Sequence, residues 1–111
     1  MSAYVPVLLA EPGLEAGLAA GFEEESVPVR FEQAQGDAVS LARNAARASP
    51  LGLGVGADRE RLVLVLAAAP GRPYLEAPAT ATRAFGQAAA RVAARRPLAT
   101  PLAAGGARRA G

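Results

Sequence analysis

Three consecutive glutamates, Glu23–Glu25, are the residues of this sequence whose type and spacing most suggest chemistry. Paired-carboxylate catalysis does not fit them, because consecutive side chains do not converge on one point and nothing apolar around them raises a pKa. They follow a predicted helix end, where each negative charge opposes the helix dipole by about 0.3–1 kcal/mol. Such a local conflict can mark a functional site. The alternative, which the residues alone favour, is a solvated turn that keeps a sheet edge soluble.

A glycine-rich segment, residues 52–57, partly matches the dinucleotide-binding pattern G-x-G-x-x-G/A. That pattern binds pyrophosphate only where the glycines join a strand to a helix, whereas here Asp58 begins a turn and a second apolar strand follows. No Gly-Lys-Ser/Thr follows either, which excludes a P-loop and ATPase activity of the chain on its own. We interpret the alternate glycines as a bare strand face that a helix or another chain approaches closely.

The composition excludes most classes of enzyme. The 111 residues include no Cys and no His, which rules out disulfide scaffolds, thiolate zinc sites and every catalytic scheme that needs imidazole. Ser49 precedes Pro50 at a predicted helix end and has no general base beside it, so it is not a candidate nucleophile. We therefore expect a protein that is not an enzyme and has no catalytic residues.

All twelve basic residues are arginine, and the net charge is +2. Five of them lie in the last 21 residues: Arg91, Arg95, Arg96, Arg108 and Arg109. A basic helix face and tail of this kind leave open an alternative function, a small scaffold module that contacts nucleic acid through its C-terminal arginines. Aromatic residues make up only 5% of the chain, so the stacking surface that RNA and single-strand binders use is nearly absent.

The residue pattern predicts a single layered α/β domain over residues 1–98, with a mixed sheet of about four to five strands. Strands are expected at residues 3–9, 27–31, 51–57 and 61–67, the last two as a hairpin. Helices are expected at residues 14–22, with Gly21 as the C-cap, at 37–48, with Asp37 as the N-cap, and at about 80–95. Residues 70–78 read as a loop punctuated by proline, and residues 99–111 as a flexible Ala/Gly/Arg tail.

Alanine makes up about half of the hydrophobic residues, 29 in all, so the core is expected to be thin and to need apolar cover from a partner. No stretch reaches the ~20 apolar residues of a membrane-spanning helix. The first residues also lack the features of a signal peptide. We expect a cytoplasmic protein with no membrane partner.

Three segments, in this order and spacing, resemble the small (beta) subunit of the reactivating factor for coenzyme-B12-dependent diol and glycerol dehydratases. They are residues 21–29 (GFEEESVPV), 42–58 (ARNAARASPLGLGVGAD) and 85–92 (FGQAAARV). The family versions are G-I-E-E-E-G-I-P-F, A-A-x-S-P-L-x-V-G-I-x-x-D and G-x-N-A-A-R-L-V-K-G-I-P-F. The likeness covers about residues 4–98. Among the departures, Ser26 replaces the glycine that follows E-E-E, and Val29 replaces a phenylalanine.

The resemblance implies a non-catalytic, chaperone-like subunit whose fold is shared with a subunit of the dehydratase and is similar to an anticodon-binding domain. In that family a large ATPase subunit, which binds ATP or ADP, holds the small subunits. The complex releases damaged cobalamin from the inactivated dehydratase by exchanging the small subunit for its dehydratase counterpart. The resemblance thus implies a hetero-oligomer and a B12-dependent dehydratase as partners, and allows association with a bacterial microcompartment.

The resemblance also implies site residues. Glu24 matches the glutamate that the family presents to a magnesium ion at the interface with the large subunit, and a hard cation held by one carboxylate from each side suits magnesium. The implied partner interface comprises Glu23, Glu24, Glu25, Pro28, Ser49 and Pro50. No cofactor is expected on this chain alone. Gln87-Ala88 and Arg95–Leu98 stand where the family has x-N and K-G-I-P-F, which leaves the client open between a diol and a glycerol dehydratase.

Overall fold

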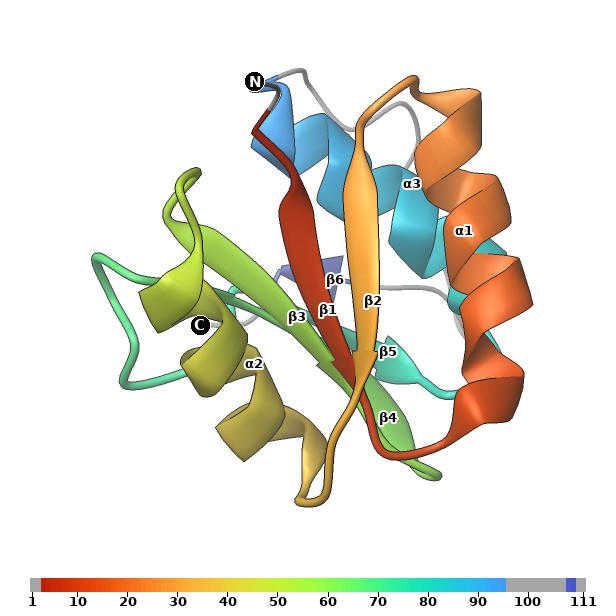
Figure 1. Ribbon diagram of the computed structural model, residues 1–111, viewed down its shortest axis with the longest axis horizontal. Coiled ribbons are helices and arrows are strands. Elements are labelled where there is room, and N and C mark those ends of the chain that lie inside the picture. Colours follow the sequence, from red (N-terminus) through yellow and green to blue (C-terminus); the bar gives the residue numbers. More distant parts are fainter. Residues whose placement is uncertain (1–2, 96–107, 110–111) are drawn as a thin grey trace.

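The computed structural model describes residues 3–95 and 108–109. In chain order its elements are β1 (Val5–Leu9), the 3-10 helix η1 (Pro12–Leu14), α1 (Glu15–Glu24), β2 (Val29–Gln33), α2 (Ala38–Ala48), β3 (Leu53–Ala57), β4 (Arg61–Leu66), β5 (Leu75–Pro78), α3 (Thr82–Ala93) and β6 (Arg108–Arg109). The strands form one sheet in the order β2-β1-β3-β4-β5-β6. Helices α1 and α3 pack together on one face of the sheet, and α2 covers part of the other (Figure 1).

The sheet is mixed, as the sequence predicts. β1 runs parallel to β2 and to β3, because α1 and α2 provide the crossover connections that parallel strands need. β3, β4, β5 and β6 are joined by antiparallel pairing. Pro6 is tolerated inside β1 because Val5 donates its N–H to β2, so the nitrogen of Pro6 faces β3, where pairing begins only at Val7.

The core consists of two apolar clusters, one on each face of the sheet. The larger cluster packs β1, β3, β4 and β5 against α1 and α3, with Leu18, Phe22 and Phe85 as its bulky helical members. The smaller one packs three alanines of α2 (Ala38, Ala42 and Ala46) against Val63 and Val65 of β4. The α2 face is thus filled mostly by small side chains, which agrees with the thin core expected from the alanine content.

Helix α1 does not end at Gly21, so the predicted C-cap is wrong. Gly21 lies inside the helix, where a Cβ would come within 2.4 Å of the Arg83 carbonyl oxygen of α3. The helix ends with the hydrogen bonds of a Schellman motif, from the N–H of Ser26 to the Glu23 oxygen (3.0 Å) and from the N–H of Val27 to the Phe22 oxygen (3.2 Å). Ser26 takes the left-handed conformation at a φ of 56°, the position at which such motifs favour glycine.

The alternate glycines of β3 do allow close helix packing, and the helix is α2 of the same chain. A Cβ on Gly54 would come within 2.3 Å of the Ala46 nitrogen, and one on Gly56 within 2.1 Å of the Ala38 oxygen. These neighbours are backbone atoms, which cannot rotate aside. The bare face of β3 is therefore used inside the fold and is not open to another protein.

The β3–β4 hairpin predicted from the sequence is confirmed, with Ala57 paired to Leu62 nearest the turn. Asp58 holds the turn, because its Oδ1 accepts the backbone N–H groups of Glu60 (2.8 Å) and Arg61 (2.9 Å). Its Oδ2 accepts the N–H of Ala38 at the start of α2 (2.8 Å). One carboxylate therefore ties the hairpin to the helix. The predicted N-cap of α2 is also confirmed, since Asp37 accepts the Ser40 N–H at 2.9 Å.

The interpretation of residues 70–78 as a loop is wrong at its C-terminal end. Leu75 and Ala77 are buried and alternate with exposed or half-buried neighbours in β5, which pairs with β4. Of the tail predicted to be flexible, Arg108 and Arg109 form β6 beside β5, and the remainder lies outside the described residues. Within the described residues, none of the helices has the length and hydropathy to span a bilayer.

Candidate functional site

The glutamate run lies where α1 ends against α3. The two helices approach closely because glycines face each other at their contact: a Cβ on Gly86 of α3 would come within 2.6 Å of the Leu18 oxygen and 3.1 Å of the Gly21 Cα of α1. This short separation brings polar side chains of α3 within reach of the glutamates. The sequence pattern placed the glutamates beyond the end of the helix. In the structure Glu23 and Glu24 belong to the last turn of α1 and Glu25 is its C-cap, so the run begins inside the helix.

Glu24 is held by two side chains of α3. Its Oε2 accepts the Arg83 Nε–H at 2.5 Å, and its Oε1 accepts the Gln87 amide at 2.7 Å. The hydrogen bond from Arg83 is the main cause that lowers the pKa of Glu24; burial opposes it, and the hydrogen bond from Gln87 adds to it. Glu24 is therefore a carboxylate at neutral pH. Its side chain is 35% exposed and that of Arg83 is 69% exposed, so the pair remains open to solvent and to a partner.

Glu25 forms a more protected ion pair with α3. Its Oε2 lies 3.1 Å from Nη2 of Arg91, and the Glu25 side chain is only 10% exposed. Glu23 is exposed. The three glutamates thus differ in environment: Glu25 fixes α1 to α3, Glu24 is a carboxylate held at the surface, and Glu23 faces solvent. Of these, Glu24 combines a defined orientation with access from outside.

Glu24 by itself does not form a metal site. Within residues 3–95, no group of three Asp or Glu side chains converges in a way that could hold an ion. The chemistry of a single ionised carboxylate nevertheless fits one ligand position of a hard cation such as magnesium, with the other ligands supplied from outside the chain. Each Glu24 oxygen accepts one hydrogen bond and so keeps a lone pair with which it could ligate the ion.

The remaining residues of the implied interface lie at the same end of the sheet as the glutamates, where the parallel strands β2 and β3 begin. Pro28 precedes β2, and its carbonyl oxygen accepts the Val5 N–H of β1 at 3.0 Å. Ser49 and Pro50 lie between the end of α2 and the start of β3. Ser49 is engaged in the turn, because its Oγ accepts the N–H of Leu51. In the described structure no hydrogen bond or ion pair joins Ser49 or Pro50 to the glutamates.

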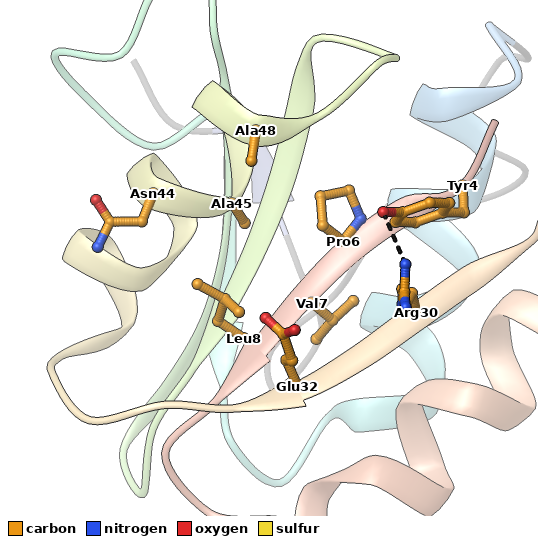
Figure 2. A pocket seen from close by; sticks show the side chains of 9 residues that line it. All are labelled: Tyr4, Pro6, Val7, Leu8, Arg30, Glu32, Asn44, Ala45 and Ala48. Carbon is orange, nitrogen blue, oxygen red and sulfur yellow. Dashed lines mark hydrogen bonds between the residues drawn. The ribbon is translucent and has the colours of Figure 1, made fainter.

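A groove that the sequence analysis missed lies on the α2 side of β1 and β2. Its volume is about 270 Å³, and it is lined by Tyr4, Pro6, Val7, Leu8, Arg30, Glu32, Asn44, Ala45 and Ala48 (Figure 2). Arg30 donates to the Tyr4 hydroxyl at 3.3 Å, and its guanidinium carbon lies 5.4 Å from the centre of the Tyr4 ring. The signal in the sequence was the charged alternation of Arg30 and Glu32, but the groove exists because α2 covers β3 and β4 and leaves β2 bare.

The arginine face expected on α3 is partly neutralised. Arg83 and Arg91 are paired with Glu24 and Glu25, and Arg95 is exposed beyond the helix end. Arg96 lies outside the described residues. Pairing with carboxylates reduces the positive potential that phosphate binding requires. The structure therefore gives no support to the nucleic-acid alternative from this helix.

Comparisons with known proteins agree with the resemblance seen in the sequence. The family model for the dehydratase medium subunit matches residues 9–99. A chain in a structure of the diol dehydratase-reactivating factor complexed with ADP and Mg²⁺ has a TM-score of 0.80 and 27% identity, covering 90% of this chain and 100% of that one. A chain of a glycerol dehydratase reactivase has a TM-score of 0.78 and 27% identity, covering 89% and 98% respectively. A search of curated proteins by sequence gave no significant match.

Proposed function

Because this chain belongs to the dehydratase medium-subunit family, we propose that it works as the small, non-catalytic subunit of a reactivating factor for a diol or glycerol dehydratase. The observation that carries the proposal is the match with the reactivating-factor chain, which is covered over 100% of its length at a TM-score of 0.80. The absence of His and Cys from the sequence is consistent with a binding role.

The mode of action proposed is subunit exchange. The family model is named for a dehydratase subunit, whereas the solved relatives are reactivating factors, so one fold occurs in both assemblies. A small subunit with this fold is suited to give up its place on a large ATPase subunit, which binds ATP or ADP, to its dehydratase counterpart. In this proposal the exchange opens the inactivated dehydratase, and damaged cobalamin leaves so that intact coenzyme can enter.

Glu24 is the residue proposed to link the two subunits through a magnesium ion. Magnesium would supply a positive charge that draws carboxylates from both subunits together. What supports Glu24 over its neighbours is its state in the free chain: ionised, oriented by Arg83 and Gln87, and partly exposed. The surrounding contact surface is proposed to include Glu23, Glu25 and Pro28 beside it, and Ser49 and Pro50 at the same end of the sheet.

The proposal is tested by measuring the mass in solution of this chain mixed with a reactivating-factor large subunit. Samples with and without ADP and Mg²⁺ are compared by light scattering after gel filtration. We expect a complex of defined stoichiometry. Separate elution of the two proteins under every condition would refute the assignment. A purified, inactivated dehydratase then tests the finer mechanism, because the complex should release its damaged cobalamin only when this chain is present.

The metal contact is tested by Glu24→Gln, with Glu15→Gln as the control, which makes the same change of charge at the other end of α1, where Glu15 is exposed. Mutating residues that only hydrogen-bond to metal ligands lowers metal affinity by about 10–100-fold. Losing a direct ligand should therefore weaken binding to the large subunit in the presence of Mg²⁺ by at least about tenfold. The control should assemble like the wild type. If Glu24→Gln binds the large subunit equally well with and without Mg²⁺, Glu24 is not a ligand, although the reactivating role would stand.

A further inference from the structure

Strand β2 has an open edge. It is the first strand of the sheet, and β1 pairs with only one side of it. The Pro28 oxygen and the Ala34 N–H both bond to β1, so the alternation of a parallel ladder also turns the backbone groups of Arg30 and Glu32 toward β1. The N–H and C=O groups of Val29, Phe31 and Gln33 therefore point to the open edge, where another strand could bond to them.

The side chains of β2 divide cleanly between its two faces. Val29 and Phe31 pack partly buried against the larger core cluster. Arg30 and Glu32 lie on the opposite face, where both line the groove beside α2 (Figure 2). Two opposite charges, two residues apart, thus lie on one face of a strand whose outer edge is open.

These two facts select one partner strand. An antiparallel strand identical to β2 can bond through residues 29, 31 and 33 only in registers that place these residues opposite one another. A register centred on residue 30 sets Arg30 against Arg30 of the second copy, and one centred on residue 32 sets Glu32 against Glu32. The register centred on Phe31 sets Arg30 of each copy opposite Glu32 of the other.

We propose that β2 pairs antiparallel with β2 of a second copy of this chain about a two-fold axis at Phe31, forming a homodimer with one continuous sheet. In this register Phe31 exchanges both backbone hydrogen bonds with its symmetry mate. Arg30 and Glu32 form the closer, non-hydrogen-bonded pairs, where cross-strand charges interact most strongly. The two phenylalanines meet on the other face, which gives the partly buried rings a cross-strand aromatic contact.

Self-complementarity is what favours a second copy over an unrelated strand. A two-fold interface uses the same patch twice, so an Arg–Glu pair placed symmetrically about its centre satisfies itself without any other partner. The edge lies at β2, whereas Glu24 faces α3, so the dimer does not require the contact proposed for the large subunit.

Charge reversal tests the proposal on the full chain by sedimentation velocity at increasing concentration. Wild type should dimerise, while Arg30→Glu and Glu32→Arg should each raise the dimer dissociation constant by about tenfold or more, because two attractions become two repulsions. An equimolar mixture of the two variants should associate again as a heterodimer, since residue 30 of each copy then faces an opposite charge at residue 32 of the other. Arg72→Glu, on the exposed loop before β5, is the control and should dimerise like wild type.

The mixing step separates charge pairing from misfolding, because a misfolded variant cannot regain association from its partner. Wild type that remains monomeric at every concentration overturns the proposal. So do single variants that dimerise like wild type, or a mixture that stays monomeric.

Amide hydrogen exchange by NMR supplies a second readout. Rising protein concentration should slow exchange at Val29, Phe31 and Gln33, while Arg30 and Glu32 are already protected by β1. Protection of the three amides only after a large subunit is added would assign the edge to that partner and refute the homodimer.

Discussion

Replacing Asp58 should destabilise the protein far more than its place in a surface turn suggests. Its carboxylate accepts three backbone N–H groups, two in the β3–β4 turn and one at the start of α2. A hydrogen bond to a charged group makes a net contribution of about 1.5–3 kcal/mol to stability, but the exposed amides of the turn can bond to water instead when the carboxylate is removed. The part-buried Ala38 N–H regains less. We therefore expect Asp58→Ala to lower the free energy of unfolding by about 2–3 kcal/mol.

Asp58→Asn is the sharper variant, because it keeps the size of the side chain. Asp58 uses both oxygens as acceptors, whereas Asn has one acceptor oxygen, so either Ala38 or the two turn amides lose their partner in whichever orientation the amide takes. We expect a loss of about 1–2 kcal/mol. Asp37→Asn is the matched control. Asn caps helices as well as Asp does, and this change should be nearly neutral.

The loss should also depend on pH. Burial raises the pKa of Asp58, but the hydrogen bonds from Arg61, Ala38 and Glu60 outweigh it and hold the pKa below its ordinary value of 3.8. A carboxyl whose pKa is lowered by folding stabilises the fold fully above its unfolded pKa and loses that contribution as the pH falls through the folded one. The difference between wild type and Asp58→Asn should therefore be constant above about pH 5 and shrink below about pH 4.

Urea denaturation followed by circular dichroism, repeated from pH 7 down to the lowest pH at which the wild type folds, measures these differences. At neutral pH, Asp58→Ala should also lower Tm by about 10 °C or more. Equal stability of Asp58→Asn and Asp37→Asn, or a difference from wild type that does not change with pH, would show that the carboxylate does not tie the hairpin to α2.

Two further substitutions test the backbone geometry. Gly54→Ala should lower the free energy of unfolding, measured by urea denaturation, by about 3 kcal/mol or more, because the new Cβ meets backbone atoms of α2. Gly13→Ala is the control: its Cβ would have nothing within 4 Å, so stability should change by less than about 0.5 kcal/mol. Equal effects of the two substitutions would contradict the close packing. Ser26→Gly should stabilise the protein by about 0.5–1 kcal/mol in the same assay, because glycine adopts the left-handed conformation without strain. Ser26→Ala should give no gain, and a gain equal to that of glycine would show that the conformation of residue 26 is not the cause.

The sequence was informative where the determining interactions are local. Asp37 and Ser49-Pro50 define the ends of α2 through contacts within a few residues, and both ends were predicted correctly. The hairpin was likewise predictable, because its turn and its apolar strands are adjacent in the chain. The glycines of β3 were correctly interpreted as a close-approach surface, although only the structure identifies the neighbour as α2.

Errors arose where a distant element decides the outcome. Gly21 looked like a helix end, but it is small because α3 packs against it. β5 has only two inward residues, Leu75 and Ala77, too few to reveal a strand among prolines before β4 is known to pair with it. The same applies to the candidate site. The glutamates were evident, but Arg83 lies 59 residues from Glu24, and no local pattern connects them.

The sheet order also bears on how the chain reaches this structure. The β3–β4 hairpin closes the shortest loop in the sheet, whereas β1 joins it through Val7 and Val55, almost half the chain apart. Since loop closure delays distant pairings, we expect the hairpin and α2 to form early and β1, α1 and β2 to dock late. The late-docking part then carries both Glu24 and the open edge of β2. A partner bound at either place would therefore stabilise this late-docking part and slow its unfolding.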